Sequence, residues 1–518
     1  MVVALAAFND FHGALEATRT KNRDGVSQMA GGAAGLAAEV EKIRAAHPYS
    51  LTVSAGDLIG ASQFASALFL DEPTIGAMNR IGLDLNAVGN HEFDKGQAEL
   101  LRMQNGGCSK FTTRRPCLME HFAGARFRFL AASTHRADGS SLFPATALRD
   151  FGHGSGRVRI GFIGLTLRAT ATLVSPSGVA GLRFSDEAET INAETARLKH
   201  QGADVVVVLI HQGGHQTDPS DPGACNGLTG EIGPILDRLD PLVDVVVSGH
   251  THSAYICDWQ RTTAPLPLLL TSAGVYGALV TEIELTIDPV HHRLAARKAV
   301  QHAVTPGSGP DPAVAAYVDR YLARARIEGD RTDGHLAGPA SGAVLAQLIA
   351  DAQLAASKAA GAQIAFTNLF GVRAPLQPRA DGSLSYAELY RVQPFNNSVI
   401  TQTLTGAELK AVLEQGFDTI GPEQALTPSA GFAYTVDRTR PVGDRIIAMT
   451  LNGNPIDPAA TYRVATNSFL ASGGDTFSLL AAQHDAVQGA PDLQALEAWL
   501  QASPPRAVPS DTRIAIVH

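Results

Sequence analysis

The sequence lacks a long apolar run and an excess of basic residues. No apolar segment approaches the roughly 18 residues that a membrane-spanning helix requires, so we expect no membrane span. The formal net charge is −9. This charge argues against a non-specific binder of nucleic acids or acidic membranes, because such proteins present a basic surface. Nothing indicates disorder, a repeat array or a coiled coil, and the 45% of hydrophobic residues is typical of a globular protein.

Cysteine is scarce, and the start of the chain has no basic segment. The four cysteines lie in loop-like sequence as two spaced pairs, Cys108 with Cys117 and Cys225 with Cys257, and neither pair has the C-x-x-C form of a zinc ribbon. The spacing does not determine connectivity, but we expect two disulfides with this local pairing and therefore an oxidising compartment. Four reduced thiols in a cytosolic enzyme are the alternative. Because the chain begins at Met1 without the features of a signal peptide, a periplasmic or secreted location implies that the signal peptide has been removed.

The chain is long enough for two or more domains, and its first half repeats one pattern. At 518 residues it exceeds a single ordinary core. Strand-like apolar runs end in residue types that bind metals, with helical candidates at 30–46 and 185–201 between them. The runs and their polar ends are 2–8 before Asn9-Asp10-Phe11-His12, 50–55 before Gly56-Asp57, 85–88 before Gly89-Asn90-His91-Glu92-Phe93-Asp94, 205–210 before His211, and 243–248 before Gly249-His250-Thr251-His252. The alternation predicts a layered α/β domain with its ligands beyond the carboxyl ends of the strands.

The residue types at these ends predict two divalent cations. Asp10 and His12, two apart on an expected extended segment, would project to the same side and hold one ion together. His250 and His252 repeat this spacing. Mixed carboxylate and imidazole ligands favour Mn, Zn, Fe or Co over Ca, and the sequence does not select among the four. A carboxylate bridging both ions and two further ligands of the second ion would complete the pair, and the candidates are Asp57, Asn90 and His211.

Two neighbouring divalent cations are suited to phosphoester hydrolysis. Together they lower the pKa of a bridging water and hold the phosphate oxygens for in-line attack. His91 could stabilise the charge of the transition state or protonate the leaving alcohol, and Asp94 could orient its imidazole. A single histidine in such a turn is more often structural, but five strand-end motifs in one domain favour the catalytic interpretation.

These motifs resemble, in order, the signature of the calcineurin-like metallophosphoesterases. More narrowly, Phe8-Asn9-Asp10-Phe11-His12-Gly13 and Gly89-Asn90-His91-Glu92-Phe93-Asp94 resemble the 5'-nucleotidase family, and the resemblance covers almost the whole chain. It implies a four-layer αββα metallophosphoesterase domain at residues 1–305, a linker helix within 306–338 and a C-terminal α+β substrate-binding domain at 339–518. It also implies that His91 and Asp94 are the catalytic pair. The implied metal ligands are Asp10, His12 and His252 for one ion, and Asn90, His211 and His250 for the other, with Asp57 bridging both.

The junction between the halves is visible in the sequence. The last strand-like run of the first half is 281–288, and Pro/Gly-rich sequence at 305–312 marks a boundary. We expect a helix at 313–328, a loop at 329–338, a helix at 344–359 and a strand at 363–367.

The second half contains residue types suited to a nucleoside. Arg373, beyond Gly371, could bind a phosphate or carboxylate as a fork. Phe395 and Phe469 could stack on a base, an interaction of about 1–3 kcal/mol, and Asp475 could accept hydrogen bonds from ribose hydroxyls. By the resemblance, the nucleoside-binding residues of the family's C-terminal domain match Asn368, Arg373, Phe395, Phe469 and Asp475.

One segment departs from the family pattern. Many members have an arginine that contributes to the substrate site before the first helix of the C-terminal domain, whereas here the segment reads Gly338-Pro339-Ala340-Ser341-Gly342. Either another cation such as Arg379 takes its place or the preferred substrate differs.

The expected function is a dinuclear-metal phosphohydrolase that releases phosphate from nucleoside 5'-monophosphates, with small-molecule nucleotides and not nucleic acids as substrates. A 2',3'-cyclic-nucleotide phosphodiesterase/3'-nucleotidase and a UDP-sugar hydrolase are alternatives that share the same metals. The related thiosulfohydrolase of sulfur oxidation needs no aromatic clamp, so Phe395 and Phe469 argue against it. A nucleotide-binding surface protein without turnover would have lost metal ligands, and none of the seven is missing. The oligomeric state cannot be predicted.

Overall fold

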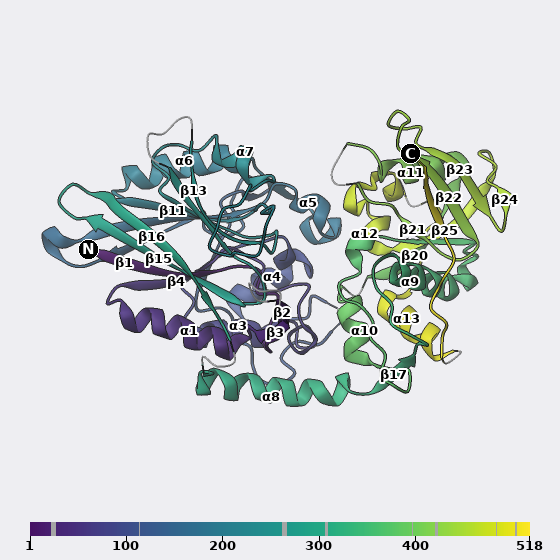
Figure 1. Ribbon diagram of the computed structural model, residues 1–518, viewed down its shortest axis with the longest axis horizontal. Coiled ribbons are helices and arrows are strands. Elements are labelled where there is room, and N and C mark those ends of the chain that lie inside the picture. Colours follow the sequence, from purple (N-terminus) through teal and green to yellow (C-terminus); the bar gives the residue numbers. More distant parts are fainter. Residues whose placement is uncertain are drawn as a thin grey trace. The chain divides into compact units, whose positions relative to one another are not determined.

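The computed structural model describes residues 1–21, 27–112, 114–261, 267–305, 309–395, 397–419, 423–482, 484–502 and 505–517 (Figure 1). The chain divides into two compact units, residues 1–171 with 177–323 and residues 324–518 with 172–176. Residues 306–308, where the predicted linker begins, lie outside the described residues. The predicted domain limits therefore stay predictions.

The first unit contains two six-stranded mixed sheets. In one sheet β1, β4 and β5 are parallel neighbours, and in the other β9, β11, β12 and β14 are parallel, so each group ends at one edge of its sheet. The first sheet has the order β16 (Arg293–Ala303), β15 (Leu279–Asp288), β1 (Val2–Phe8), β4 (Ser50–Ser54), β5 (Leu85–Ala87) and β6 (Arg128–Leu130). The second has the order β13 (Ala254–Trp259), β14 (Leu268–Ala273), β12 (Val245–Ser248), β11 (Val205–His211), β9 (Val158–Thr166) and β8 (Thr146–Phe151).

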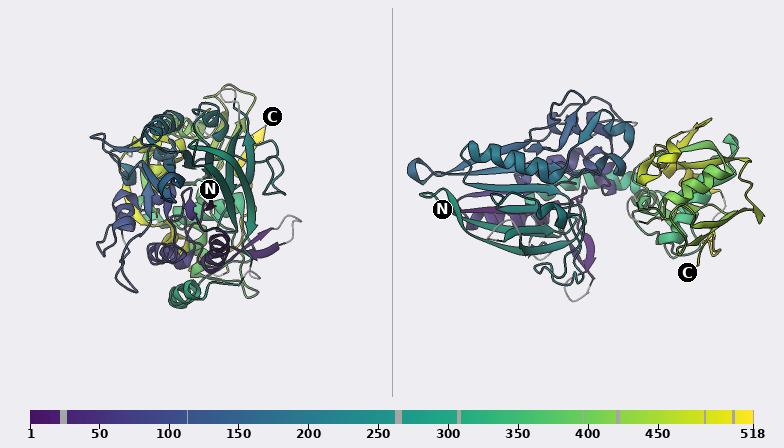
Figure 2. Two further views of the ribbon diagram at one scale, coloured as in Figure 1. Left: turned by 90° about the vertical axis from the view of Figure 1, so that its left-hand side faces the viewer. Right: turned by 90° about the horizontal axis from the view of Figure 1, so that it is seen from above.

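The two sheets pack face to face and are covered by helices. Val205, Val207 and Leu209 of β11 pack with Val3 and Leu5 of β1 in the core between the sheets, while the alternate residues of β11 pack in a second core with α6 (Glu187–His200) and α7 (Ile232–Leu236). On the other side, α1 (Ala33–Ala46) contacts β1, β4 and β15 and packs against α3 (Glu72–Ile81). The period-2 alternation of buried strands thus produces four layers, helix, sheet, sheet and helix, which Figure 2 shows from two further sides.

The helices expected from periodicity are present. α1, α6, α8 (Pro312–Gly329) and α9 (Gly342–Ala356) differ from the predicted spans by at most three residues at either end. Other elements of the first unit are α2 (Phe64–Ala67), α4 (Gly96–Asn105) and the two-stranded pairs β2 (Thr18–Lys21) with β3 (Ser27–Ala30) and β7 (Thr134–Arg136) with β10 (Leu182–Phe184), while α5 (Thr170–Leu173) spans the division between the units at residue 171.

Many strands were not predicted from the sequence, and β16 and β17 show why. β16 follows the run expected to be the last strand of the first half; it is an edge strand whose residues are all at least partly exposed, so it lacks apolar alternation. β17 (Thr332–His335) lies in the segment 329–338, where the prediction of a loop was wrong. Its sequence Thr-Asp-Gly-His carries no strand signal, and it forms by pairing with the distant β19 (Ser383–Ser385).

The second unit is built on a five-stranded and a four-stranded sheet. The first has the order β21 (Thr427–Pro428), β18 (Ile364–Thr367), β25 (Thr461–Asn467), β20 (Ser398–Thr405) and β26 (Val487–Pro491), and the second β24 (Asn454–Pro455), β23 (Ile446–Leu451), β22 (Phe432–Asp437) and β27 (Ile514–Val517). One face of the five-stranded sheet packs against α9 and α13 (Asp492–Gln501), and the other against α11 (Gly406–Gln415) and the four-stranded sheet. The remaining helices are α10 (Tyr386–Val392) and α12 (Ser468–Ala471).

Two disulfides join the cysteines with the expected local pairing, Cys108 with Cys117 and Cys225 with Cys257. Among the described residues, none of the helices combines the length and the apolar character that crossing a membrane requires.

Candidate active site

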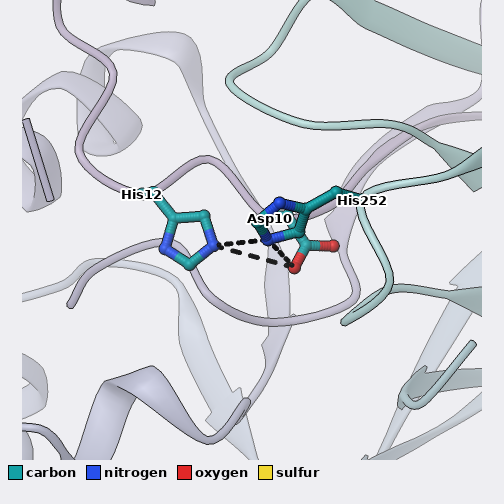
Figure 3. Close-up of side chains that lie close together, drawn as sticks. All are labelled: Asp10, His12 and His252. Carbon is teal, nitrogen blue, oxygen red and sulfur yellow. Dashed lines mark hydrogen bonds and ion pairs between the residues drawn. The ribbon is translucent and has the colours of Figure 1, made fainter. Parts of the chain in front are cut away.

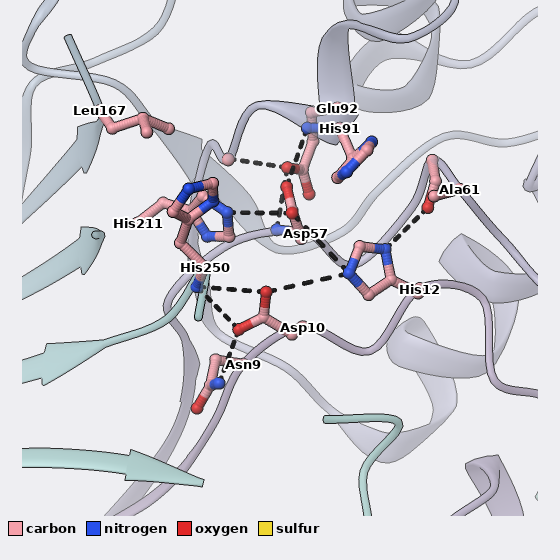
Figure 4. A network of polar contacts seen from close by, with 12 residues as sticks. Asn9, Asp10, His12, Asp57, Ala61, His91, Glu92, Leu167, His211 and His250 are labelled. Carbon is pink, nitrogen blue, oxygen red and sulfur yellow. Dashed lines mark hydrogen bonds and ion pairs between the residues drawn. The ribbon is translucent and has the colours of Figure 1, made fainter. Parts of the chain in front are cut away.

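The candidate metal ligands gather at the carboxyl ends of strands in the first unit. β1, β4 and β5 deliver Asp10, Asp57 and Asn90, and β11 and β12 of the second sheet deliver His211 and His250. Figure 4 shows Asp10, Asp57, His211 and His250 close together. Two glycines allow the loops to approach one another closely. A side chain at Gly56, whose φ is +94°, would lie 2.7 Å from Nδ1 of His211, and one at Gly89 would overlap the carboxylate of Asp57.

Asp10, His12 and His252 form the first cluster of potential ligands. Nε2 of His12 lies 3.1 Å from Nε2 of His252, and Oδ1 of Asp10 lies 3.8 Å and 3.5 Å from these two nitrogens (Figure 3). Nδ1 of His12 lies 2.8 Å from the carbonyl oxygen of Gly60 and would donate to it, which directs the lone pair of Nε2 into the cluster.

Asp57, His211 and His250 form the second cluster. Nε2 of His211 lies 2.9 Å from Oδ2 of Asp57, and the same oxygen lies 3.8 Å from Nε2 of His12 in the first cluster. The Asp57 carboxylate is therefore placed between the two clusters. Nδ1 of His211 lies 2.8 Å from the carbonyl oxygen of Ala55, so this ring also directs Nε2 inward.

The backbone differs from the expected extended segments. Asp10, His12, Asp57, His250 and His252 all have φ between 47° and 73°, in the left-handed region. The expectation that Asp10 and His12, and likewise His250 and His252, lie on extended segments was therefore wrong. Asp10 and His12 still meet in one cluster, but His250 and His252 turn into different clusters. Left-handed conformations of such residues are uncommon and concentrate at functional sites.

Three buried atoms of the site suit a cation. Among the described residues, Oδ1 of Asn90 is buried without a hydrogen-bond partner, and the buried Oδ2 of Asp57 and Nε2 of His211 have no partner beyond the ion pair that they form with each other at 2.9 Å. Buried polar atoms without partners are rare and unfavourable. Carboxylate, amide oxygen and imidazole are ligands of first-row divalent metals, so the donor set fits such ions.

The pKa shifts of the buried side chains also suit a site that binds cations. Burial raises the pKa of Asp10 to about 7 and that of Glu92 to about 8. Burial lowers the pKa of His12 well below its usual value and, together with the charge of His211, lowers that of His250 to about 3. Burial alone would lower the pKa of His211, but the Asp57 carboxylate raises it to about 10. Bound cations would supply the charge that these buried carboxylates need.

His91 and Asp94 lie beside the two clusters. Nδ1 of His91 is 3.0 Å from each oxygen of the Asp94 carboxylate, and the backbone N–H of His91 donates to Oδ1 of Asp57. The ring of His91 is 5.2 Å from that of His12. The N–H of Ala61 donates to Asp94, which holds the carboxylate against the imidazole.

Glu92 and Asn9 support the site, and sequence reasoning assigned neither a role. The buried Glu92 carboxylate accepts the backbone N–H groups of Asp57, Leu58 and Gly89 at 2.7–2.9 Å, and so joins the loops after β4 and β5. Asn9 donates to Oδ2 of Asp10 at 2.7 Å. Asn9 stands next to the predicted ligand Asp10, and Glu92 stands next to the predicted catalytic residue His91. For Glu92 the available signal was an acidic residue within the motif that contains these candidates.

Most of the predicted nucleoside-binding residues lie close together in the second unit. β18 and β25 are parallel neighbours, so the residues that follow them meet at one edge. Nδ2 of Asn368 donates to Oδ2 of Asp475 at 2.6 Å, and the exposed guanidinium of Arg373 lies 5.9 Å from the centre of the half-buried Phe395 ring. Burial raises the pKa of Asp475 to about 6, against the effects of Asn368 and Arg373.

The two remaining predicted residues flank this group. Gly371 packs against the side chain of Asn368, where a Cβ would lie 2.8 Å from Oδ1, and the half-buried Phe469 packs against Gly474, the neighbour of Asp475. A residue that sequence reasoning missed, Asn467, donates to Oδ1 of Asn368 at 3.0 Å. Arg379, the suggested substitute for the missing arginine, is exposed and lies by Ser383.

Comparison with known proteins agrees with this architecture. A family model described as "Calcineurin-like phosphoesterase" matches residues 4–254, and one described as "5'-nucleotidase, C-terminal domain" matches residues 325–482. The chain is similar to the endonuclease YhcR of Bacillus subtilis, with 28% identity over 90% of this chain and 37% of that protein. It is also similar to the cell wall protein Lmo0130 of Listeria monocytogenes, with 27% identity over 92% of this chain and 64% of that protein. The chain thus spans less than two thirds of the length of either relative.

Among solved structures, the 5'-nucleotidase precursor from Thermus thermophilus superposes with a TM-score of 0.79 at 25% identity, covering 100% of this chain and 99% of that one.

Proposed function

The chain belongs to the 5'-nucleotidase family of calcineurin-like phosphoesterases, and on that premise we propose that it is a dinuclear-metal phosphohydrolase acting on nucleoside 5'-monophosphates. The observation that carries the proposal is the convergence of two clusters of ligand side chains on one carboxylate, Asp57. Among the described residues, Oδ1 of Asn90 is also buried without a hydrogen-bond partner, which a purely structural role would not require.

Asp10, His12 and His252 of the first cluster would hold one ion. His211 and His250 of the second cluster would hold the other together with Asn90, and Asp57 would contribute to both. Ions bound there supply Lewis acidity toward the phosphate and a nucleophile at neutral pH. The chain's own part is to hold the ligand atoms in place, with the carbonyl oxygens of Gly60 and Ala55 fixing the tautomers of His12 and His211.

His91 and Asp94 are proposed to act on the departing alcohol. The Asp94 carboxylate accepts a hydrogen bond from Nδ1 of His91 and orients the ring, so Nε2 is the atom that donates to the phosphate or the leaving oxygen. Because the backbone N–H of His91 is anchored on Asp57, the imidazole keeps a fixed position relative to the ligand clusters.

The second unit is proposed to bind the nucleoside. Phe395 and Phe469 stack on the base, Asp475 accepts hydrogen bonds from the ribose hydroxyls, and Asn368 holds the Asp475 carboxylate. Arg373, beyond Gly371, supplies the cation. Stacking tolerates every base, so we propose broad base specificity.

A location outside the reducing cytoplasm, in the periplasm or secreted, is part of the proposal. The two disulfides support it, because disulfides persist in oxidising compartments. One relative is a cell wall protein, which is consistent with such a location.

The test is phosphate release by protein stripped of metal and then supplied with Mn²⁺ or Zn²⁺, with 5'-AMP, 3'-AMP, 2',3'-cyclic AMP and UDP-glucose as substrates. Fast, metal-dependent turnover of 5'-AMP is the expected result. A preference for 3'-AMP or the cyclic ester would keep the two-metal chemistry and replace the substrate. Absence of turnover on all four would contradict the proposal.

The nucleoside site is tested separately by Phe469→Ala. Loss of base stacking, about 1–3 kcal/mol, should raise KM for 5'-AMP by roughly 5- to 150-fold and change kcat little. Phe111→Ala is the matched control, since Phe111 is an exposed phenylalanine of the first unit. Equal kinetics of the two variants would remove Phe469 from the substrate site.

A further inference from the structure

A separate cluster of imidazole and carboxylate side chains lies on the first sheet. It comprises His47, at the carboxyl end of α1, Glu282 and Glu284 on β15, and His302 on β16. The buried Ile283 faces the core between the sheets. Its two neighbours on the strand therefore project from the opposite face, on which α1 packs. None of the four residues belongs to the candidate active site.

Glu282 contacts both histidines. Its Oε1 lies 2.6 Å from Nε2 of His47, and its Oε2 lies 2.7 Å from Nε2 of His302. A carboxylate oxygen of Glu284 lies within 4.8 Å of the ligand atoms of His47 and Glu282. The ligand atoms of His47, Glu282 and Glu284 thus lie close together, and His302 joins them through the second oxygen of Glu282.

The surroundings resemble those of bound metals more than those of an ordinary surface ion pair. The side chains of His47, Glu282 and His302 are 15%, 16% and 31% exposed, so the cluster is shielded but open to an entering ion. Oε1 of the buried Glu39 lies 3.7 Å from Nδ1 of His302. A carboxylate behind the second ring nitrogen is the usual partner of a metal-binding histidine.

Two lysines are the competing cations. Lys42 pairs with Glu39 at 2.8 Å, on the oxygen that does not face His302, and Lys298 pairs with Glu284 at 3.4 Å. The Lys298 side chain is 67% exposed, and such surface pairs are weak. Glu282, at the centre of the cluster, directs its two oxygens to the histidines instead.

We propose that His47, Glu282 and Glu284, together with His302 on the second oxygen of Glu282, form a structural site for a divalent cation of the Zn²⁺ type, which fastens the carboxyl end of α1 to β15 and β16. Mixed imidazole and carboxylate donors suit Zn²⁺, Co²⁺, Ni²⁺ or Cu²⁺, whereas Ca²⁺ and Mg²⁺ prefer oxygen alone. The site is independent of the proposed catalytic function, because it shares no ligand with the catalytic clusters.

The test counts bound Zn²⁺ in the full chain, stripped of metal and dialysed to equilibrium against micromolar Zn²⁺. Wild type should bind one equivalent more than the variant His47→Ala/His302→Ala, whatever number the catalytic clusters bind. The matched control is His291→Ala/His292→Ala, because each of these two exposed histidines pairs with a single carboxylate, Asp288 or Asp204. The control should bind as much as wild type.

Equal binding by wild type and the His47→Ala/His302→Ala variant would overturn the proposal, and so would an equal loss in the control. Should the double variant fail to fold, Glu284→Gln on the partly exposed strand face replaces it. That single change should weaken Zn²⁺ binding at this site at least about 10-fold, and Glu39→Gln should weaken it by about 10- to 100-fold, as is typical when a partner of a ligating histidine is removed. Unchanged affinity in both single variants would equally overturn the proposal.

Discussion

His91 is the side chain on which turnover should depend most. It is held by Asp94 and by the backbone contact to Asp57, yet it belongs to neither ligand cluster. His91→Ala should therefore lower kcat by about 10²- to 10⁴-fold, the usual contribution of a positioned general acid, while bound metal stays at the wild-type level. Phosphate-release kinetics and elemental analysis of the same samples measure both quantities.

Asp94→Asn is the companion variant. It keeps the size of the side chain but removes the charge that orients the imidazole, so its loss of kcat should be smaller and metal content again unchanged. If His91→Ala lost metal together with activity, His91 would be a ligand and the proposed division of roles would be wrong.

Asp475 predicts a dependence of substrate binding on pH. Burial raises its pKa to about 6, so the carboxylate that would accept from the ribose is ionised above that pH and protonated below it. KM for a nucleoside monophosphate should therefore rise as pH falls through about 6. In Asp475→Asn, KM should be raised at pH 8 and should lack this inflection. An identical inflection in the variant would assign it to another group.

At the scale of elements, the site depends on how strand ends are joined. Glu92 accepts N–H groups from the loops after both β4 and β5, which carry Asp57 and Asn90. Glu92→Gln would place an amide N–H₂ against backbone donors and loosen both loops. We expect metal affinity to fall by about 10- to 100-fold, as is usual when groups behind metal ligands are changed. Equilibrium dialysis with Mn²⁺ measures this.

Glu99→Gln provides the matched control for Glu92→Gln. Glu99 is also a buried glutamate, but it pairs with Arg102 on α4 and contacts no candidate ligand. This variant should lose stability and keep metal affinity. If both variants lost stability and neither lost metal, Glu92 would be an ordinary buried acid.

The edge strand β16 shows where element prediction failed. All of its residues are at least partly exposed, so burial imposes no apolar pattern on the sequence of this strand. The strand exists because it pairs with β15 along nearly its whole length. The placement of His302 opposite Val280, diagonal to Glu282, follows from that register and from nothing local to residues 293–303.

At the scale of the whole molecule, the two units have separate hydrophobic cores. Removing metal should therefore lower the Tm of a thermal transition that involves the first unit, because ions that bind only the folded state stabilise it, by about 2.7 kcal/mol at a concentration of 100 times Kd. Scanning calorimetry with and without chelator measures the shift, which Mn²⁺ should restore.

His211→Ala should reduce the response of Tm to chelator, whereas Asp475→Asn, in the second unit, should keep it. A Tm that chelator leaves unchanged in wild type would show that the strand ends of the first unit hold no stabilising ion.

The amino-acid sequence alone predicts the kind of site and its candidate ligands. The candidate ligands directly follow buried strands, so apolar runs and the polar residues after them are adjacent in the chain and can be read locally. The same holds for α1, α6 and α8, whose periodicity reflects one buried face, whereas α9 is buried around most of its circumference. The resemblance extended this reading to the second unit, where Asn368 and Asp475 are in contact.

The contacts between distant segments come from the tertiary structure. The spacing of His250 and His252 predicted one shared direction, and only the resemblance separated them; in the structure their left-handed backbone and the approach of the β1 and β4 loops place them in different clusters. The function of Glu92 as an acceptor for two loops, and the meeting of His47 with Glu282 across 235 residues, likewise depend on sheet register and helix packing. Local sequence cannot encode these contacts, since each partner is selected by packing between segments that are far apart in the chain.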